Sequence, residues 1–287
     1  MACNSRREII VADRNNHRIQ VFDRNGKFLL KFGLNGQFNQ PHGVTVDQRN
    51  NQIVVADTHN NRVQIFDERG TFLRAFGSEG QGDGQFSSPR GVAVDQQGNY
   101  VVADFDHHRI QIINSQGQFV RKFGSKGTEN GQMEFPIGIG LLSNGNIVVA
   151  ENRLQTFDSH GNFVRIVGAE QVKDPWHLFV DSDDNILVAD HSNNCIQVFH
   201  QNGNHIKTIG TGQLSSPRGV CMDHEGRIIV SENGVAEFPS FRPVSLILIT
   251  FYFYLLIILI IQERGRQTGY LLFFVRKILG KCFEGVF

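Results

Sequence analysis

The sequence predicts an all-β protein, a β-propeller with four-stranded blades. Three observations lead to this prediction. A unit of 40-odd residues repeats along the chain, and each unit holds four short apolar stretches. Turn residues separate these stretches, and the chain has 30 glycines among its 287 residues to supply them. A repeat of this length built from four strands is typical of a propeller blade.

The repeat is visible when the chain is compared with itself. The stretch VVADTHNNRVQIFDERGTFLRAFG (54–77) returns as IVADRNNHRIQVFDRNGKFLLKFG (10–33) and VVADFDHHRIQIINSQGQFVRKFG (101–124), and in more divergent form at 148–168 and 187–210. The acidic residue after its Val-Ala pair recurs every 39 to 47 residues, at Asp13, Asp57, Asp104, Glu151, Asp190 and Glu232. Copies from the second onward are preceded by Pro-x-Gly or a relic of it. This regularity predicts copies at 7–33, 41–77, 89–124, 136–168, 175–210 and 217–234.

Each complete copy reads as four strands of about five residues joined by short turns. In the second copy these are GVTVD, QIVVAD, NRVQIFD and TFLRAF, which alternate or run in short β-branched stretches. Copies two to five hold all four strands. The first copy is expected to lack its opening strand, with residues 1–6 as an N-terminal stub, and the last to stop after two strands.

The pattern Pro-x-Gly-Val-x-Val-Asp followed by Val-Ala-Asp-x-x-Asn-x-Arg-Ile-Gln-x-Phe resembles the NHL repeat, over roughly residues 7 to 234. The resemblance implies a six-bladed propeller, of which about five blades' worth of strands are present, so the propeller is expected to be incomplete. It also implies a relationship to the C-terminal domain of TRIM-NHL proteins, which act as ubiquitin ligases and RNA-binding repressors. RING, B-box and coiled-coil segments precede the propeller in those proteins, and this chain contains none of them.

The repeat breaks off after Gly234, and residues 235–287 form an apolar tail. Its stretch 244–261 is an unbroken run of 18 apolar or hydroxyl residues, the threshold length for a membrane-spanning helix. Basic residues follow this run, which would place the C-terminus in the cytoplasm. Translated non-coding sequence is the competing interpretation, because the tail begins in the middle of a blade. A membrane partner is expected only if 244–261 is a genuine span.

Composition narrows the cellular setting. The chain carries 28 basic and 28 acidic residues, so net charge alone indicates neither a nucleic acid nor a membrane partner. Four cysteines show no spacing typical of zinc sites, and no metal or other cofactor is expected. The first residues lack the apolar core of a signal peptide, and the chain has no N-x-S/T sequon. These features favour a cytoplasmic location, with a single-pass membrane protein as the alternative.

Propeller topology predicts which residues share a face. The loop after Val-Ala-Asp and the middle residue of Pro-x-Gly lie at the same end of the central channel, which we call the top face. Basic, imidazole and aromatic groups gather there, and such groups suit single-stranded RNA or an acidic protein segment. The resemblance also favours this face, because known NHL propellers bind RNA or protein partners there. The candidate binding residues are Arg14, His42, His59, Arg90, Phe105, His107, His108, Trp176, His177, His191 and Arg218.

Structural roles compete with binding for several of these residues. Arg18, Arg62 and Arg109 each follow the repeat aspartate by five residues, and pairs Asp13–Arg18, Asp57–Arg62 and Asp104–Arg109 are expected to close the loops within a blade. The repeated asparagines Asn15, Asn60 and Asn193 suit turn backbones. Loop histidines are commonly just solvated, and Trp176 occupies a position between blades where it could simply pack.

Enzymatic chemistry is not expected. The first strands read GVTVD, GVAVD, GIGLL, LFVD and GVCMD, which offer almost no metal ligand or catalytic group to the channel. Lactonase- and lyase-type propellers are therefore the less favoured alternative. The sequence predicts a non-catalytic module that recruits RNA or a protein through its top face, in a ubiquitin ligase or a post-transcriptional repressor.

Overall fold

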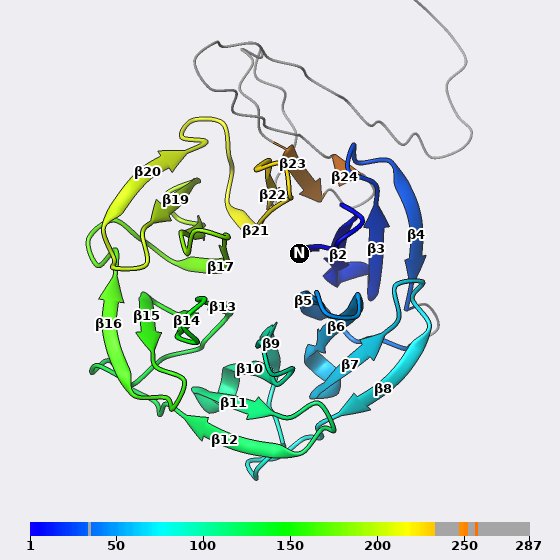
Figure 1. Ribbon diagram of the computed structural model, residues 1–287, viewed down its shortest axis with the longest axis horizontal. Coiled ribbons are helices and arrows are strands. Elements are labelled where there is room, and N and C mark those ends of the chain that lie inside the picture. The colour runs from blue at the N-terminus through cyan, green and yellow to red at the C-terminus, as the bar shows by residue number, and fades with distance from the viewer. Residues whose placement is uncertain (34–35, 233–246, 252–255, 258–287) are drawn as a thin grey trace, which may run out of the picture.

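The strands form a ring of four-stranded sheets around a central axis (Figure 1). The structure is a computed structural model, and it describes residues 1–33, 36–232, 247–251 and 256–257. Within these residues there are six sheets, and five of them are antiparallel throughout. The innermost strands surround this axis, and the outermost ones form the rim. The prediction of an all-β propeller with four-stranded blades is confirmed.

The first three blades follow the chain in order. Blade one consists of β1 (Ala2–Cys3), β2 (Ile9–Asp13), β3 (Arg18–Phe22) and β4 (Phe28–Phe32). Blade two consists of β5 (Pro41–Asp47), β6 (Gln52–Asp57), β7 (Arg62–Phe66) and β8 (Phe72–Phe76). Blade three consists of β9 (Pro89–Val94), β10 (Tyr100–Asp104), β11 (Arg109–Ile113) and β12 (Phe119–Phe123). In each of them a one-turn 3-10 helix joins the second strand to the third, at Arg14–Asn16, Thr58–Asn60 and Phe105–His107.

The remaining sheets continue the ring. Blade four consists of β13 (Gly138–Leu141), β14 (Ile147–Ala150), β15 (Leu154–Phe157) and β16 (Phe163–Val167). Blade five consists of β17 (Pro175–Val180), β18 (Ile186–Asp190), β19 (Cys195–Phe199) and β20 (His205–Ile209). The sixth sheet consists of β21 (Pro217–Met222), β22 (Ile228–Glu232), β23 (Ile247–Phe251) and β24 (Leu256–Ile257).

The two ends of the ring differ from the sequence-based expectation. The first copy does have an opening strand, because Ala2 pairs with Ile10 and Cys3 with Ile9 in β1 and β2. This strand has only two residues and is followed by polar ones, so the sequence alone gives no strand pattern there. Residues 1–6 therefore contribute to blade one instead of forming a separate stub.

The sixth sheet departs from the blade pattern at its third strand. Strands β21 and β22 are antiparallel, but β23 runs parallel to β22. Strands β23 and β24 come from the stretch 244–261, and its other residues lie outside the described part of the chain, as do most residues of the tail 235–287. Among the described residues, no helix is long and apolar enough to span a membrane.

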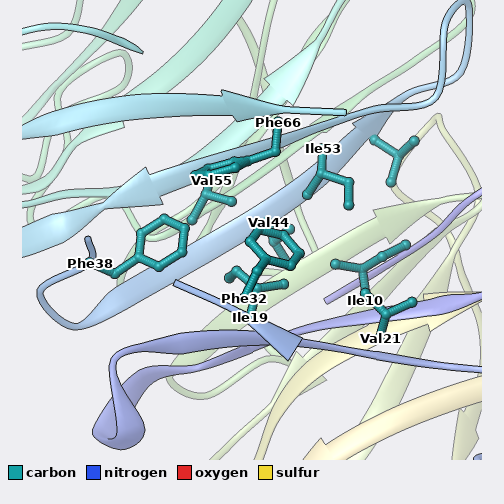
Figure 2. Close-up of a cluster of buried hydrophobic side chains, with 10 residues drawn as sticks. Ile10, Ile19, Val21, Phe32, Phe38, Val44, Ile53, Val55 and Phe66 are labelled. Atoms are coloured by element: carbon teal, nitrogen blue, oxygen red, sulfur yellow. The ribbon is translucent and has the colours of Figure 1, made fainter. Parts of the chain in front are cut away.

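The hydrophobic core lies between the blades. Six clusters of buried side chains occur among the described residues, and each joins two neighbouring sheets. Figure 2 shows the cluster between blades one and two, in which Phe32 and Phe66 lie 5.0 Å apart between ring centroids. Successive side chains of a strand point to opposite faces of the blade, and both faces pack against neighbouring blades except at the outer edge. Apolar side chains on both faces therefore contribute to these clusters.

The ring closes between the sixth sheet and the first. Met1 and Cys3 pack with Ile9 on one side and with Cys221 and Ile229 on the other. The Sγ atoms of Cys3 and Cys221 lie 3.5 Å apart, and both cysteines are free thiols. Residues from the first and last repeats therefore share one core cluster.

The glycine of Pro-x-Gly sets the spacing of the innermost strands. A Cβ atom on Gly43 would lie 2.2 Å from the carbonyl oxygen of Arg90, and one on Gly91 would lie 2.3 Å from that of Ile137. The backbones of neighbouring blades approach too closely at this point for a side chain. The residue before each glycine is consequently held against the next blade at the channel, with its side chain at the top face.

Candidate functional site

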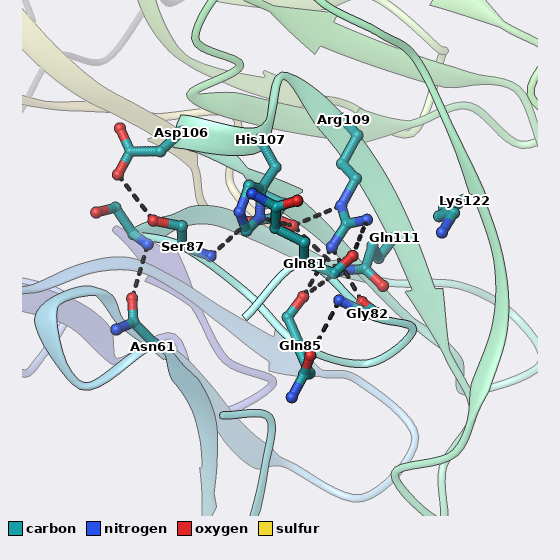
Figure 3. Close-up of polar contacts among 12 residues, drawn as sticks. Asn61, Gln81, Gly82, Gln85, Ser87, Asp106, His107, Arg109, Gln111 and Lys122 are labelled. Carbon is teal, nitrogen blue, oxygen red and sulfur yellow. Dashed lines mark hydrogen bonds and ion pairs between the residues drawn. The ribbon is translucent and has the colours of Figure 1, made fainter. Parts of the chain in front are cut away.

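The aspartate that ends each Val-Ala-Asp strand organises its blade. Asp104 is fully buried, and its Oδ1 atom accepts a hydrogen bond from the Ser87 backbone N–H at 2.7 Å. Its Oδ2 atom accepts bonds from Arg109 Nε at 2.7 Å and Gln111 Nε2 at 3.1 Å (Figure 3). His107 Nδ1 lies 3.0 Å from the same oxygen and must donate, because a carboxylate only accepts. Asp104 thereby ties together the loop, the third strand and the segment that enters the blade.

The same arrangement recurs, so the expected Asp–Arg pairs are structural. Arg18 Nε lies 2.8 Å from Asp13, and Arg62 Nε lies 2.9 Å from Asp57. Blade four keeps a shorter version between Glu151 and Arg153, at 3.1 Å. In three of these loops the side-chain amide of an asparagine donates to the repeat aspartate: Asn16 to Asp13, Asn60 to Asp57 and Asn193 to Asp190. In the first loop this residue is Asn16 and not Asn15, which we had named from the sequence.

Blade five lacks the guanidinium of this arrangement. Cys195 replaces the arginine, and the fully buried carboxylate of Asp190 is bonded to the Lys173 N–H and the Asn193 amide. With no cationic partner, burial raises the pKa of Asp190 above its usual value. Burial also raises the pKa of the Cys195 thiol, to about 11, so this cysteine is an unreactive packing residue.

A second repeated contact joins each loop to the next blade. The residue before the third strand adopts a left-handed conformation, with φ between 51° and 53°, at His17, Asn61, His108 and Asn194. Its side chain accepts a hydrogen bond from a backbone N–H that precedes the next Pro-x-Gly, with donors at Gln40, Ser88, Phe135 and Ser216. His108 accepts through Nδ1 at 3.2 Å, which requires an unprotonated atom. Burial, together with the charge of Lys126, lowers the pKa of His108 in agreement with this role.

One half of the top face is built on Phe105. The guanidinium carbon of Arg90, from the Pro-x-Gly of blade three, lies 3.3 Å from the centroid of the Phe105 ring. This distance is well within the range of a cation–π interaction. The Phe105 ring also packs on Phe135, with centroids 4.9 Å apart. Arg90 is therefore held in place by an aromatic support that follows the Val-Ala-Asp strand of the same blade.

The other half is built on Trp176, the only tryptophan of the chain. The Arg218 guanidinium carbon lies 4.3 Å from its ring centroid. His191 and His42 stack on the same ring system, with centroids 5.2 Å and 6.0 Å away and interplanar angles of 23° and 22°. His191 Nδ1 lies 3.2 Å from Asp174 Oδ2. These side chains come from blades two, five and six, so they meet only because the propeller closes into a ring.

Arg14 completes a cluster of three arginines at the channel mouth. Its Nε and Nη2 atoms donate to Gln40 Oε1, at 3.1 Å and 2.9 Å. Burial, followed by the positive charge of Arg14, lowers the pKa of Arg90 to about 10. The pKa of Arg218 is lowered in the same way. Arg14, Arg90 and Arg218 are thus close enough to repel one another and remain charged at neutral pH; we call them the arginine cluster.

The arginine cluster lacks the carboxylate partner that most arginines of the described residues have. Most arginines of the described residues form an ion pair with a carboxylate, as in Arg49–Asp47 at 2.7 Å or Arg227–Asp223 at 2.6 Å. No described carboxylate lies within ion-pair distance of the arginine cluster. The Nε atoms of Arg90 and Arg218 are buried without an acceptor among the described residues, whereas their terminal nitrogens reach solvent.

Two histidines lie beneath this cluster in neutral form. Burial lowers the pKa of His177 to about 3, with a further contribution from the Met1 ammonium. Burial also lowers the pKa of His42 well below its usual value, aided by the charges of Arg90 and Arg14. At neutral pH the positive charge of the channel mouth therefore comes from guanidinium groups and not from imidazoles.

The structure gathers eight of the eleven predicted binding residues around the channel: Arg14, His42, Arg90, Phe105, Trp176, His177, His191 and Arg218. His107 and His108 instead hold the loop of blade three, and His59 is exposed on the loop of blade two. Gln40 and Phe135 were missed. Both immediately precede the proline of a Pro-x-Gly, and this repeated position is the sequence signal that would have identified them.

Over the part of the chain that the structure describes, no three His, Cys, Asp or Glu side chains are arranged to hold a metal ion. The channel mouth instead presents arginines on aromatic supports, an arrangement for binding anionic groups.

Fold and site together define a β-propeller with a cationic channel mouth. The family model of the NHL repeat matches residues 1–22, 38–66, 86–113 and 173–199, so this propeller carries NHL repeats. No curated protein matches the chain.

Solved structures with a similar fold come from several functional classes. Streptogramin B lyase is 15% identical over 79% of this chain and 73% of that chain, with a TM-score of 0.59. A nidogen/laminin complex contains a chain 14% identical over 75% and 81%, with a TM-score of 0.62. A gluconolactonase from Xanthomonas campestris is 15% identical over 80% of each chain, with a TM-score of 0.61. At these identities the likeness shows the fold alone.

Proposed function

We propose that this chain is a non-catalytic binding module that recruits RNA or a protein segment through the top face of its propeller. The observation that carries the proposal is the arginine cluster, whose charges lack a carboxylate partner among the described residues. Buried or half-buried cations without such a partner are costly to maintain, which supports an anionic group from another molecule as their partner.

The proposed context is the NHL portion of a TRIM-NHL-like ubiquitin ligase in the cytoplasm, acting in protein ubiquitination or post-transcriptional repression. The matched NHL repeats support this context, because the repeat pattern first indicated that family. The proposed role is non-catalytic because the guanidinium groups at the channel mouth are held on aromatic rings, an arrangement suited to binding anionic groups.

Charge reversal at the channel mouth tests the proposal. The double variant Arg90→Glu with Arg218→Glu is expected to abolish capture of partners from a cell extract. Arg121→Glu with Arg165→Glu is the matched control, because both arginines lie on the outer strands β12 and β16. Nuclease treatment separates RNA from protein partners, and RNA affinity should fall steeply with rising salt. Equal capture by the wild-type chain and the channel-mouth variant would contradict the proposal.

A further inference from the structure

We propose that the arginine cluster binds the carboxylates of an acidic peptide segment, and that a nucleic acid strand is not its ligand. The proposal rests on the proposed function, since it names the partner that the top face takes up. Three features of the described residues support it: the way in which the arginines are held, the occupied faces of the aromatic rings and the acidic residues beside the cluster.

The arginines are held in position before any ligand arrives. Arg90 lies on Phe105 and Arg218 lies on Trp176, while Arg14 is held by the side-chain oxygen of Gln40. Only the Nε atoms of Arg90 and Arg218 are buried, so the edge formed by the terminal nitrogens is available. A guanidinium edge of this kind matches the two oxygens of a carboxylate. Fixing the side chains in advance also reduces the entropy lost on binding.

The aromatic rings at the channel mouth already carry stacking partners. Phe105 contacts Arg90 and Phe135, and Trp176 contacts Arg218 and two histidines, one of them at a centroid distance of 5.2 Å. Recognition of single-stranded RNA commonly depends on bases stacked against aromatic rings. A base would have to displace an arginine or a histidine here. These rings therefore act as supports for charge, and this favours a peptide as the ligand.

Acidic residues lie at the edge of the cluster. Asp106 follows Phe105, whose ring supports Arg90. Asp174 lies 3.2 Å from His191, which stacks on Trp176 beside Arg218. A nucleic acid strand carries a negative charge on every nucleotide, so carboxylates beside the cluster oppose its binding. A peptide avoids this repulsion when its acidic side chains are confined to the centre.

The test is a selection of short random peptides displayed on phage against the immobilised full chain. Acidic peptides are expected to be enriched. The most enriched peptide, labelled with a fluorophore, is then titrated with wild type, Arg90→Gln, Arg218→Gln and the control Arg165→Gln. Each of the first two variants should weaken binding by about tenfold or more, since a charge-assisted bond is lost. Trp176 provides an independent readout, because its emission should change when the peptide binds beside Arg218.

An oligouridine RNA titrated in parallel separates the possible failures. If RNA binds in a manner that depends on Arg90 and Arg218 while acidic peptides do not, the peptide proposal is overturned and top-face binding stands. If neither ligand depends on these arginines, both proposals fail. Enriched peptides without acidic residues would also overturn the peptide proposal. Thermal unfolding of each variant identifies any loss of binding that is due to misfolding.

Discussion

At the channel mouth two guanidinium groups lie on aromatic rings, Arg90 at 3.3 Å from Phe105 and Arg218 at 4.3 Å from Trp176. In most arginines elsewhere in the described chain, a carboxylate performs this holding role, as Asp104 does for Arg109. An aromatic support fixes the position of a cation without neutralising its charge. This difference in support distinguishes the proposed binding residues from the structural ones.

Removal of one support tests its contribution at the level of a single residue. Phe105→Leu keeps the charge of Arg90 but removes the ring beneath it. We expect binding of the selected acidic peptide to weaken by roughly three- to tenfold, the size of a partly exposed cation–π interaction. Fluorescence anisotropy measures the affinity. Phe105→Tyr keeps a ring and should bind nearly as well as wild type; an equal loss in both variants would exclude this explanation.

His108 illustrates how a residue predicted on the top face can have a structural role. It occupies the same left-handed position as Asn61 and Asn194 and accepts the same kind of bond. Either residue type offers an acceptor at this distance from the backbone. The shared feature is the acceptor and not the imidazole.

Substitution at His108 should therefore distinguish an acceptor from an apolar side chain. His108→Asn is expected to leave stability nearly unchanged. His108→Leu should lower the free energy of unfolding by about 1–2 kcal/mol, because the Phe135 N–H loses its partner. Urea denaturation of both variants gives the two values. Similar destabilisation by Asn and Leu would show that the imidazole has a further role.

At the scale of the blade, the Val-Ala-Asp carboxylate joins elements that are distant in sequence. Asp104 receives bonds from the entering segment through Ser87 and from the third strand through Arg109 and Gln111. Its burial is tolerated because its oxygens are hydrogen-bonded and a cation lies beside it. Asp190 has the same position without the cation.

This comparison predicts unequal effects of one substitution in two blades. Asp104→Ala leaves the guanidinium of Arg109 buried without a carboxylate and should cost about 3–5 kcal/mol. Asp190→Ala leaves only neutral donors and should cost about 1–3 kcal/mol. Chemical denaturation of the two variants tests the difference. Equal losses would mean that the guanidinium contributes nothing beyond a neutral hydrogen bond.

At the scale of the whole molecule, ring closure leaves neutral, half-buried histidines around the channel. His177 has a pKa of about 3 in the folded protein, and that of His42 is also lowered well below 6.5. The groups that face them are positive: the Met1 ammonium for both, and Arg14 and Arg90 for His42. In the unfolded chain these histidines return to an ordinary pKa near 6.5.

Stability should consequently fall in acid. The unfolded chain takes up protons on these histidines below about pH 6.5, whereas the folded protein does not until the pH approaches 3 for His177. The stability is therefore fully present above pH 6.5 and is lost as the pH falls through the window between about 6.5 and 3. Protonation of His177 in the unfolded chain should lower the free energy of unfolding by roughly 2 kcal/mol between pH 7 and pH 5, and His42 should act in the same direction.

Denaturation curves measured across this pH range check the prediction. His177→Gln should show a shallower loss of stability toward acid than wild type, because one of the protonating groups is removed. His59→Gln is the control, since His59 is exposed on the loop of blade two. Parallel curves for wild type and His177→Gln would contradict a neutral His177.

The sequence by itself determined the blades. The spacing of the repeat, the alternation within its strands and the glycine of Pro-x-Gly are local properties, and they specify four strands, their turns and the close approach of neighbouring blades. They also specified the Asp–Arg pairs, since Asp57 and Arg62 are neighbours across one loop. Topology also predicted that Arg90, Trp176 and Arg218 lie close to the channel, whereas their role in binding stays a prediction.

Only the tertiary structure decided how those side chains act. Trp176 meets Arg218 and His42 because blades five, six and two converge at the channel, and no sequence spacing encodes a contact across the ring. The same closure places Cys3 of the first repeat beside Cys221 of the last. The physical reason is that the repeat governs interactions within a blade and between neighbours, whereas charge, burial and stacking at the channel depend on all blades at once.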